Sequence, residues 1–218
     1  MSIWVKICGN TSIEDAKLSA EAGADAVGFV FAPSPRRVTT EQVAAIVPQL
    51  PQAVEKIGVF VDTAAEEITT IVRACGLTGV QLHSDAGAET PAKLRAEFGP
   101  GLRILRVVHF GAGAMEQSAA IARDFNIDAV LVDSRTKAAV GGTGIAFDWN
   151  AAARTIFRDG QTVRLVAAGG LKAETVEEAI MTLRPWGVDV ASGVEAAPGR
   201  KDPEKVRVFI SNARFARR

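Results

Sequence analysis

Eight short β-rich segments alternate with eight helical segments along the 218-residue chain, and this alternation restricts the fold more than any other feature. The segments rich in β-branched and apolar residues cover 4–9, 26–32, 56–62, 79–83, 103–110, 129–134, 164–170 and 188–194. Helical patterns follow them at 12–23, 39–50, 64–76, 90–99, 115–125, 147–157, 173–184 and 202–215. Strict alternation of this kind predicts parallel strands joined by right-handed crossovers.

The number of units selects the type of parallel sheet. An open doubly wound sheet usually has about five or six strands and a GxGxxG turn after the first, whereas the first turn here reads CGNTS. Eight units predict closure as an α/β fold of the (β/α)8 TIM-barrel type. Since no linker or change in composition divides the chain, we expect residues 1–218 to form a single barrel domain. Its chemistry then belongs to the C-terminal ends of the strands.

Charge and composition exclude several classes of protein. Lys plus Arg and Asp plus Glu are balanced at 25 each, which indicates no nucleic-acid partner. Charged residues interrupt the N-terminal region, and no apolar run is long enough for a signal peptide or a membrane span. We therefore expect a cytoplasmic protein with no membrane partner, in which Cys8 and Cys75 are free thiols. The oligomeric state is left open.

Cys8 and Asp133 end the first and sixth strand segments, and both are candidate catalytic residues. Side chains alternate along a strand, so Lys6 and Cys8 share one face while Val5 and Ile7 share the other. The same counting places Asp133 on the inward face of its strand. A thiol and a carboxylate above one cavity can divide the roles of general base and general acid. The alternatives are a small buried hydrophobe for Cys8 and a cap or loop ion pair for Asp133.

Three glycine-rich turns follow late strand segments, at 141–144, 168–170 and 192–195. Barrels often bind phosphate with the loops after strands seven and eight, where glycine lets backbone N–H groups approach the oxygens. Ordinary glycine turns are the alternative. Because three such turns border one rim, we predict a phosphate site and a phosphorylated small-molecule substrate.

Arg36 and two histidines complete the candidate rim residues. Arg36 lies in APSPRRV after the second strand segment, where prolines restrict the loop, and its planar guanidinium can bind a substrate carboxylate bidentately. A solvated arginine is the alternative. His83 and His109 end the fourth and fifth segments as candidate neutral donors to a substrate. No Cys or His spacing matches a zinc site, so we expect no bound metal.

Several motifs occur in a characteristic order: KICGNT, DAVGFVFAPSPR, IGVFVD, VQLH, VD before GGTG, FDW, AGGL, and VDVASGVE followed by GRKD. Over nearly its whole length the chain thus resembles the phosphoribosylanthranilate isomerase family, the barrel enzymes of tryptophan biosynthesis. A cysteine stands where related barrels of histidine biosynthesis carry an aspartate. Two positions differ from the common pattern, since Ser84 replaces a frequent glycine and Ile145 a frequent lysine.

The resemblance implies an Amadori rearrangement of N-(5′-phosphoribosyl)anthranilate to the carboxyphenylamino-deoxyribulose phosphate, without a cofactor. It makes Cys8 the general base, Asp133 the general acid and Arg36 the ligand of the anthranilate carboxylate. It assigns the substrate phosphate to Gly142, Gly169, Gly170, Ser192 and Gly193.

Three other functions are the alternatives to this one. An isomerase that also accepts the histidine-pathway aminoimidazole is disfavoured by Cys8 at the base position. A ribulose-phosphate epimerase would need metal-ligating strand ends that the sequence lacks. A barrel that only binds a phosphorylated ligand is disfavoured by the joint presence of Cys8 and Asp133.

Overall fold

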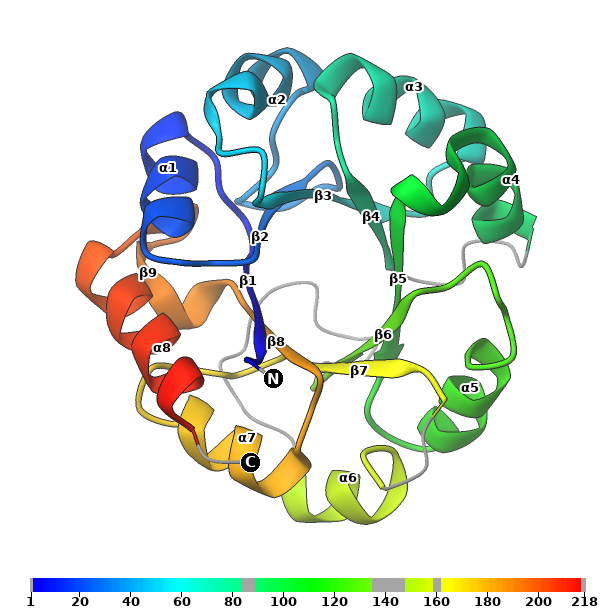
Figure 1. Ribbon diagram of the computed structural model, residues 1–218, viewed down its shortest axis with the longest axis vertical. Helices are drawn as coiled ribbons and strands as arrows, with labels where there is room; N and C mark the ends of the chain where they lie inside the picture. The colour runs from blue at the N-terminus through cyan, green and yellow to red at the C-terminus, as the bar shows by residue number, and fades with distance from the viewer. Residues whose placement is uncertain (1, 84–88, 135–147, 159–161, 217–218) are drawn as a thin grey trace.

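Figure 1 shows the computed structural model as a closed ring of strands surrounded by helices. The structure describes residues 2–83, 89–134, 148–158 and 162–216. Eight parallel strands pair in sequence order, and the last pairs with the first. They are β1 Trp4–Ile7, β2 Ala26–Val30, β3 Glu55–Val61, β4 Gly79–His83, β5 Arg103–His109, β6 Ala129–Asp133, β7 Arg164–Ala167 and β8 Gly187–Val190. The predicted TIM barrel is confirmed.

Helices form the outer ring in Figure 1. They are α1 Ile13–Glu21, α2 Thr40–Ile46, α3 Ala65–Cys75, α4 Glu89–Phe98, α5 Ala114–Ile121, α6 Trp149–Thr155, α7 Val176–Leu183 and α8 Pro203–Phe215. Short 3-10 turns cover η1 Val47–Gln49, η2 Gly99–Gly101 and η3 Ser192–Val194. Within the described ranges, no helix has the length and apolar character needed to cross a membrane. The cytoplasmic location stays a prediction.

Two differences from the expected elements have local causes. The helix predicted over 39–50 ends at Ile46 and continues as η1, because Pro48 has no N–H to donate. A short antiparallel hairpin, β9 Glu195–Ala197 with β10 Arg200–Lys201, follows η3. Its sequence EAAPGRK lacks the β-branched alternation that predicts strands, so the sequence gives no sign of it.

The alternation of side chains along β1 and β6 is confirmed. Val5 and Ile7 belong to the layer between strands and helices, whereas Lys6 is fully buried inside the barrel. Leu131 belongs to the barrel interior, on the same face of β6 as Asp133. The apolar interior consists of Trp4, Ala26, Ile57, Leu105, Val107, Ala129, Leu131, Val166 and Ala168.

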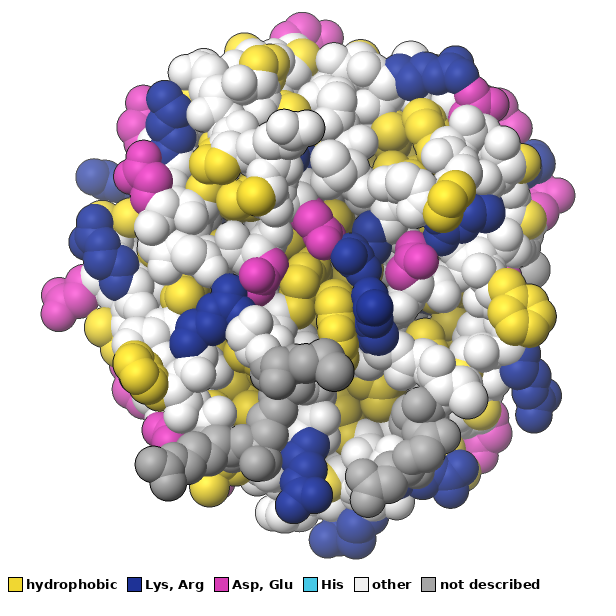
Figure 2. All heavy atoms as spheres, viewed as in Figure 1, with side chains coloured by type: hydrophobic (Ala, Val, Ile, Leu, Met, Phe, Trp, Pro, Cys, Tyr) yellow, Lys and Arg dark blue, Asp and Glu magenta, His cyan; other side chains and the backbone are white. Residues whose placement is uncertain are grey.

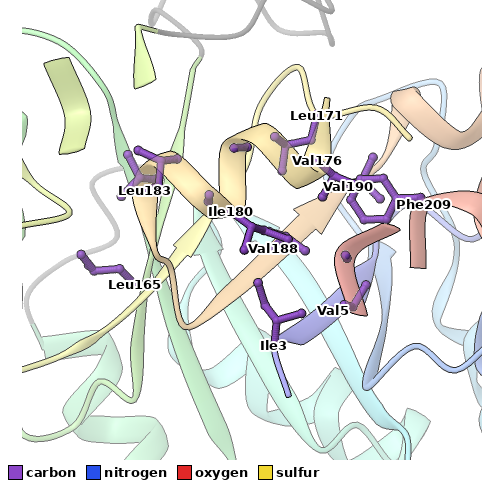
Figure 3. Packing of buried hydrophobic residues seen from close by; sticks show 14 of the residues in the cluster. Ile3, Val5, Leu165, Leu171, Val176, Ile180, Leu183, Val188, Val190 and Phe209 are labelled. Atoms are coloured by element: carbon purple, nitrogen blue, oxygen red, sulfur yellow. The ribbon is translucent and has the colours of Figure 1, made fainter. Parts of the chain in front are cut away.

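Figure 3 shows part of the apolar layer that joins the last helices to the closing strands. Phe209 of α8 lies beside Val190 of β8, and both are buried in one cluster with Val5 of β1. β1 and β8 are the pair that closes the barrel. Phe209 therefore packs α8 against the closure.

The end of the barrel where β1 begins is held by aromatic and ionic contacts, and Figure 2 shows charged side chains of both signs around its apolar centre. Trp4 and Trp186 stack with ring centroids 5.1 Å apart. Arg103 and Arg164 lie with their guanidinium carbons 5.5 and 4.8 Å from the Trp186 ring centroid. Arg103 also donates through Nε and Nη2 to both oxygens of Glu55, at 2.6 and 2.8 Å. These contacts stabilise the fold at the end opposite the predicted site.

Phe209→Ala is expected to lower the free energy of unfolding by about 3–5 kcal/mol, because it leaves a cavity under α8 at the barrel closure. Urea unfolding followed by circular dichroism measures this loss. Phe215→Ala on the same helix is the control, since Phe215 is 79% exposed. Its removal should change the free energy of unfolding by less than about 0.5 kcal/mol. Equal losses in the two variants would contradict the role given to Phe209.

Candidate active site

The candidate residues that the structure describes all lie at the C-terminal ends of strands. Cys8 directly follows β1, His83 ends β4 and Asp133 ends β6. Arg36 lies in the loop after β2, and the remaining candidates follow β7 and β8: Gly169, Gly170, Ser192 and Gly193. In a parallel barrel these ends form one rim. Gly142, Ser84 and Ile145 lie outside the described residues.

Cys8 is a buried free thiol whose backbone is fixed on two sides. Its N–H donates to the Val190 carbonyl at 2.8 Å, and its own carbonyl accepts from Lys201 Nζ at 2.6 Å. Cys75 is also free and buried, but it ends helix α3, and its thiol contacts the Thr40 carbonyl at 3.4 Å. The expectation of two free thiols is confirmed.

A buried ion pair lies one inward position below Cys8. Lys6 Nζ donates to Asp189 Oδ1 at 2.8 Å and to Gln81 Oε1 at 2.9 Å. Burial by itself lowers the pKa of Lys6, but the charges of Asp189 and Cys8 and their hydrogen bonds outweigh it, so the pKa lies above its ordinary value. Lys6 therefore stays protonated and places a fixed positive charge beneath the thiol.

Arg36 is held by a second buried group of charges. Its Nε donates to Oε1 of Glu195 and its Nη2 donates to Oε2, both at 2.7 Å. Arg36 is only 9% exposed. Lys201 Nζ donates at 3.2 Å to the same carboxylate and at 3.2 Å to the Ala191 carbonyl. The alternative of a solvated Arg36 is wrong, because the side chain is paired and almost enclosed.

Burial and the shared contacts together shift the pKa values of all three groups. Hydrogen bonding to Glu195 raises the pKa of Arg36. Burial acts to raise the pKa of Glu195, but Arg36 and Lys201 outweigh it and lower the pKa below its ordinary value. Burial lowers the pKa of Lys201, an effect that Glu195 and Cys8 only partly offset.

Arg36 also lies against the loop that carries Cys8. Gly9 has φ +73°, and a Cβ added there would lie 2.6 Å from Cδ of Arg36, so the arginine stem crosses directly over this glycine. Arg36 interacts electrostatically with Cys8, as Lys6 and Lys201 do. Lys6, Arg36 and Lys201 thus lie around the thiol and share two carboxylates, those of Asp189 and Glu195.

Asp133 occupies the other side of the rim and is buried. It pairs in register with His109 on β5, whose ring centroid lies 5.1 Å from that of His83 in an edge-on arrangement. Gly169, with φ +79°, packs so closely that an added Cβ would lie 2.4 Å from Asp133 Oδ1. The turn after β7 therefore touches the candidate acid directly.

Four polar residues at the rim or just below it were not identified from the sequence: Gln81, Asp189, Glu195 and Lys201. Asp189 and Gln81 fall on inward strand positions, so alternation could have identified them as partners for Lys6. Glu195 and Lys201 lie in the hairpin, where no periodicity indicates a role. Within the described parts of the chain, no three His, Cys, Asp or Glu side chains gather as a metal site.

Comparisons with known proteins agree with this geometry. Residues 5–212 match the family model of N-(5′-phosphoribosyl)anthranilate isomerase. The enzyme of that name from Pelobacter propionicus is 43% identical over 216 residues, which cover 99% of this chain and 97% of the relative. The enzyme of Rubrobacter xylanophilus is 44% identical over 212 residues, covering 96% of this chain and 98% of that protein.

Solved structures give the same result. The phosphoribosyl anthranilate isomerase of Thermotoga maritima superposes with a TM-score of 0.85 at 39% identity and covers 97% of this chain and 98% of its own. Another such isomerase, solved in complex with reduced 1-(o-carboxyphenylamino)-1-deoxyribulose 5-phosphate, has a TM-score of 0.82 at 37% identity with the same coverage. On sequence and structure alike, this chain belongs to the N-(5′-phosphoribosyl)anthranilate isomerase family.

Proposed function

We propose that this chain converts N-(5′-phosphoribosyl)anthranilate to 1-(2-carboxyphenylamino)-1-deoxyribulose 5-phosphate, a step of tryptophan biosynthesis, with residues 1–218 acting as one barrel domain. The observation that carries the proposal is the rim, where Cys8 follows β1 and Asp133 ends β6 of one barrel, with Lys6, Arg36 and Lys201 around the thiol. A relative of similar structure binds the reduced product analogue, which supports a phosphorylated, carboxylated ligand. Loss of phosphoribosylanthranilate fluorescence on addition of purified protein tests the activity directly.

In the proposed mechanism Asp133, in its acid form, protonates the furanose ring oxygen. The ring C–O bond breaks and leaves an iminium ion between the substrate nitrogen and C1′. This cation acidifies the hydrogen on C2′. Asp133 suits the role because it ends β6 at the rim, fixed by the adjoining β5 and by the turn after β7.

Cys8, as thiolate, removes the proton from C2′ and gives an enolamine. The enolamine gains a proton at C1′ and loses one from the C2′ hydroxyl, so the product is a ketone and no proton is consumed overall. Lys6, Arg36 and Lys201 interact electrostatically with Cys8, so three basic side chains lie around the group that accepts the proton.

The two anionic ends of the substrate are assigned to different parts of the rim. The anthranilate carboxylate is assigned to Arg36, and His83 contributes a further polar contact. The phosphate is assigned to the turns after β7 and β8, at Gly169, Gly170, Ser192 and Gly193, together with Gly142. These two turns meet closely, since a Cβ added to Gly193 would lie 1.9 Å from the Leu171 carbonyl oxygen. Their backbone N–H groups suit an anion at this end of the barrel.

Cys8→Ala is expected to lower kcat by roughly 10²–10⁴-fold, because the proton acceptor is lost while the carboxylate and phosphate contacts remain. Binding of the reduced product analogue, measured by calorimetry, should change little. Cys75→Ala removes the other buried thiol and is the control, with activity close to wild type. Turnover close to wild type in Cys8→Ala would return Cys8 to the role of a small core residue.

Asp133→Asn is expected to reduce turnover by a similar factor of roughly 10²–10⁴, since the amide nearly matches the carboxyl in shape but cannot protonate the ring oxygen. A substrate analogue with the ring already open separates this step from the others. The variant should handle the open analogue much better than the natural substrate, each relative to wild type. Equal defects with the two compounds would show that Asp133 is not the acid that opens the ring.

Arg36→Met is expected to weaken binding of the reduced carboxylated analogue by roughly 10- to 150-fold, the equivalent of about 1.5–3 kcal/mol for charged hydrogen bonds. The affinity for the same compound without its ring carboxylate should hardly change. Arg37→Met is the control, because Arg37 is the exposed neighbour in the same loop. Equal losses for the two ligands would mean that Arg36 supports the loop, and that the carboxylate has another partner.

A further inference from the structure

We infer that Glu195 is a positioning residue for substrate recognition, which holds the guanidinium of Arg36 by one edge so that its other edge faces the substrate carboxylate. The inference rests on the proposed function and extends it to a residue of the β9–β10 hairpin. Glu195 itself makes no contact with substrate in this arrangement and acts only through Arg36.

The geometry of the arginine fork supports this role. A guanidinium has five N–H donors in one plane, arranged along two edges that can each engage a carboxylate. Glu195 occupies the edge formed by Nε and Nη2, with both hydrogen bonds at 2.7 Å. The edge formed by Nη1 and the second hydrogen of Nη2 stays directed away from Glu195, and it presents the bidentate pattern that a second carboxylate needs.

Glu195 is itself fixed more firmly than a surface carboxylate. Lys201 Nζ donates to its Oε1 at 3.2 Å, and Lys205 Nζ donates to its backbone carbonyl at 3.0 Å. Glu195 and Lys201 both lie in the hairpin and are both buried, and Lys201 also bonds the Cys8 carbonyl. The carboxylate that orients Arg36 is therefore linked, through Lys201, to the backbone of Cys8.

The charge of Glu195 persists at neutral pH, because Arg36 and Lys201 hold its pKa below the ordinary value despite burial. An ionised Glu195 keeps the Arg36 side chain in one orientation before the substrate arrives. Orientation in advance of binding reduces the entropy lost when the carboxylate is bound. The stem of Arg36, which crosses over Gly9, leaves the guanidinium little room for another orientation.

A double-mutant cycle tests the inference, with binding of the reduced carboxylated analogue and of its carboxylate-free counterpart measured by calorimetry. Glu195→Gln keeps the size of the side chain but removes the charge. We expect it to weaken binding of the carboxylated compound by roughly 5- to 30-fold and of the counterpart by less than about 2-fold. In the Arg36→Met background, Glu195→Gln should weaken binding of the carboxylated compound by less than a further factor of about 2, because the guanidinium through which Glu195 acts is gone.

Glu55→Gln is the matched control. Glu55 holds Arg103 through the same Nε and Nη2 edge, but at the opposite end of the barrel. Its replacement should leave both affinities unchanged even if it lowers the melting temperature by as much as Glu195→Gln does. This comparison separates a role in positioning from a loss of stability that any broken arginine–carboxylate pair causes.

Three results would overturn the inference: no loss in Glu195→Gln, equal losses for the two ligands, or the same loss with and without Arg36. If circular dichroism shows that Glu195→Gln is unfolded, Glu195→Asp replaces it, with a several-fold loss expected for the carboxylated ligand alone. An unchanged ratio of the two affinities in Glu195→Asp would equally reject the role. A wild-type protein that neither binds the analogue nor turns over the substrate would instead overturn the proposed function, and this inference with it.

Discussion

The contact between Lys201 and the Cys8 carbonyl is the constraint on which the rest of the site depends. It joins residues 193 positions apart, at 2.6 Å, and so ties the hairpin after β8 to the end of β1. The ammonium has three oxygen acceptors, those of Cys8, Ala191 and Glu195, which compensate for its burial. Removal of any one acceptor would leave a buried charge less well compensated, which is strongly unfavourable.

Two layers of buried charge lie at and below the rim. Lys6 with Asp189 forms the lower layer, and Arg36 with Glu195 and Lys201 forms the upper one. Buried ion pairs contribute little net stability compared with apolar packing, since desolvation offsets their attraction. Their role here is to fix the position of a cation near the thiol, in a buried environment where electrostatic interactions are stronger than in water.

The two ends of the barrel use similar chemistry for different purposes. Arg103 with Glu55 and Arg36 with Glu195 share the same bidentate edge. At the end where the strands begin, the arginine lies against Trp186 and is part of the packing. At the opposite rim the arginine lies beside Cys8, and its second edge is the one proposed to bind a ligand. The position in the barrel decides the role, because ligands approach the C-terminal ends of the strands.

The sequence by itself determined the barrel and the inward faces of its strands. Periodicity is a local property, so eight strand–helix units and the inward positions of Lys6 and Cys8 followed from neighbouring residues alone, and the structure confirms them. The roles of Cys8, Asp133 and Arg36 remain proposals. Only the tertiary structure paired Arg36 with Glu195 across 159 positions and brought Lys201 to Cys8. Those contacts exist because β8 closes against β1, and short-range patterns carry no information about which distant charges closure brings together.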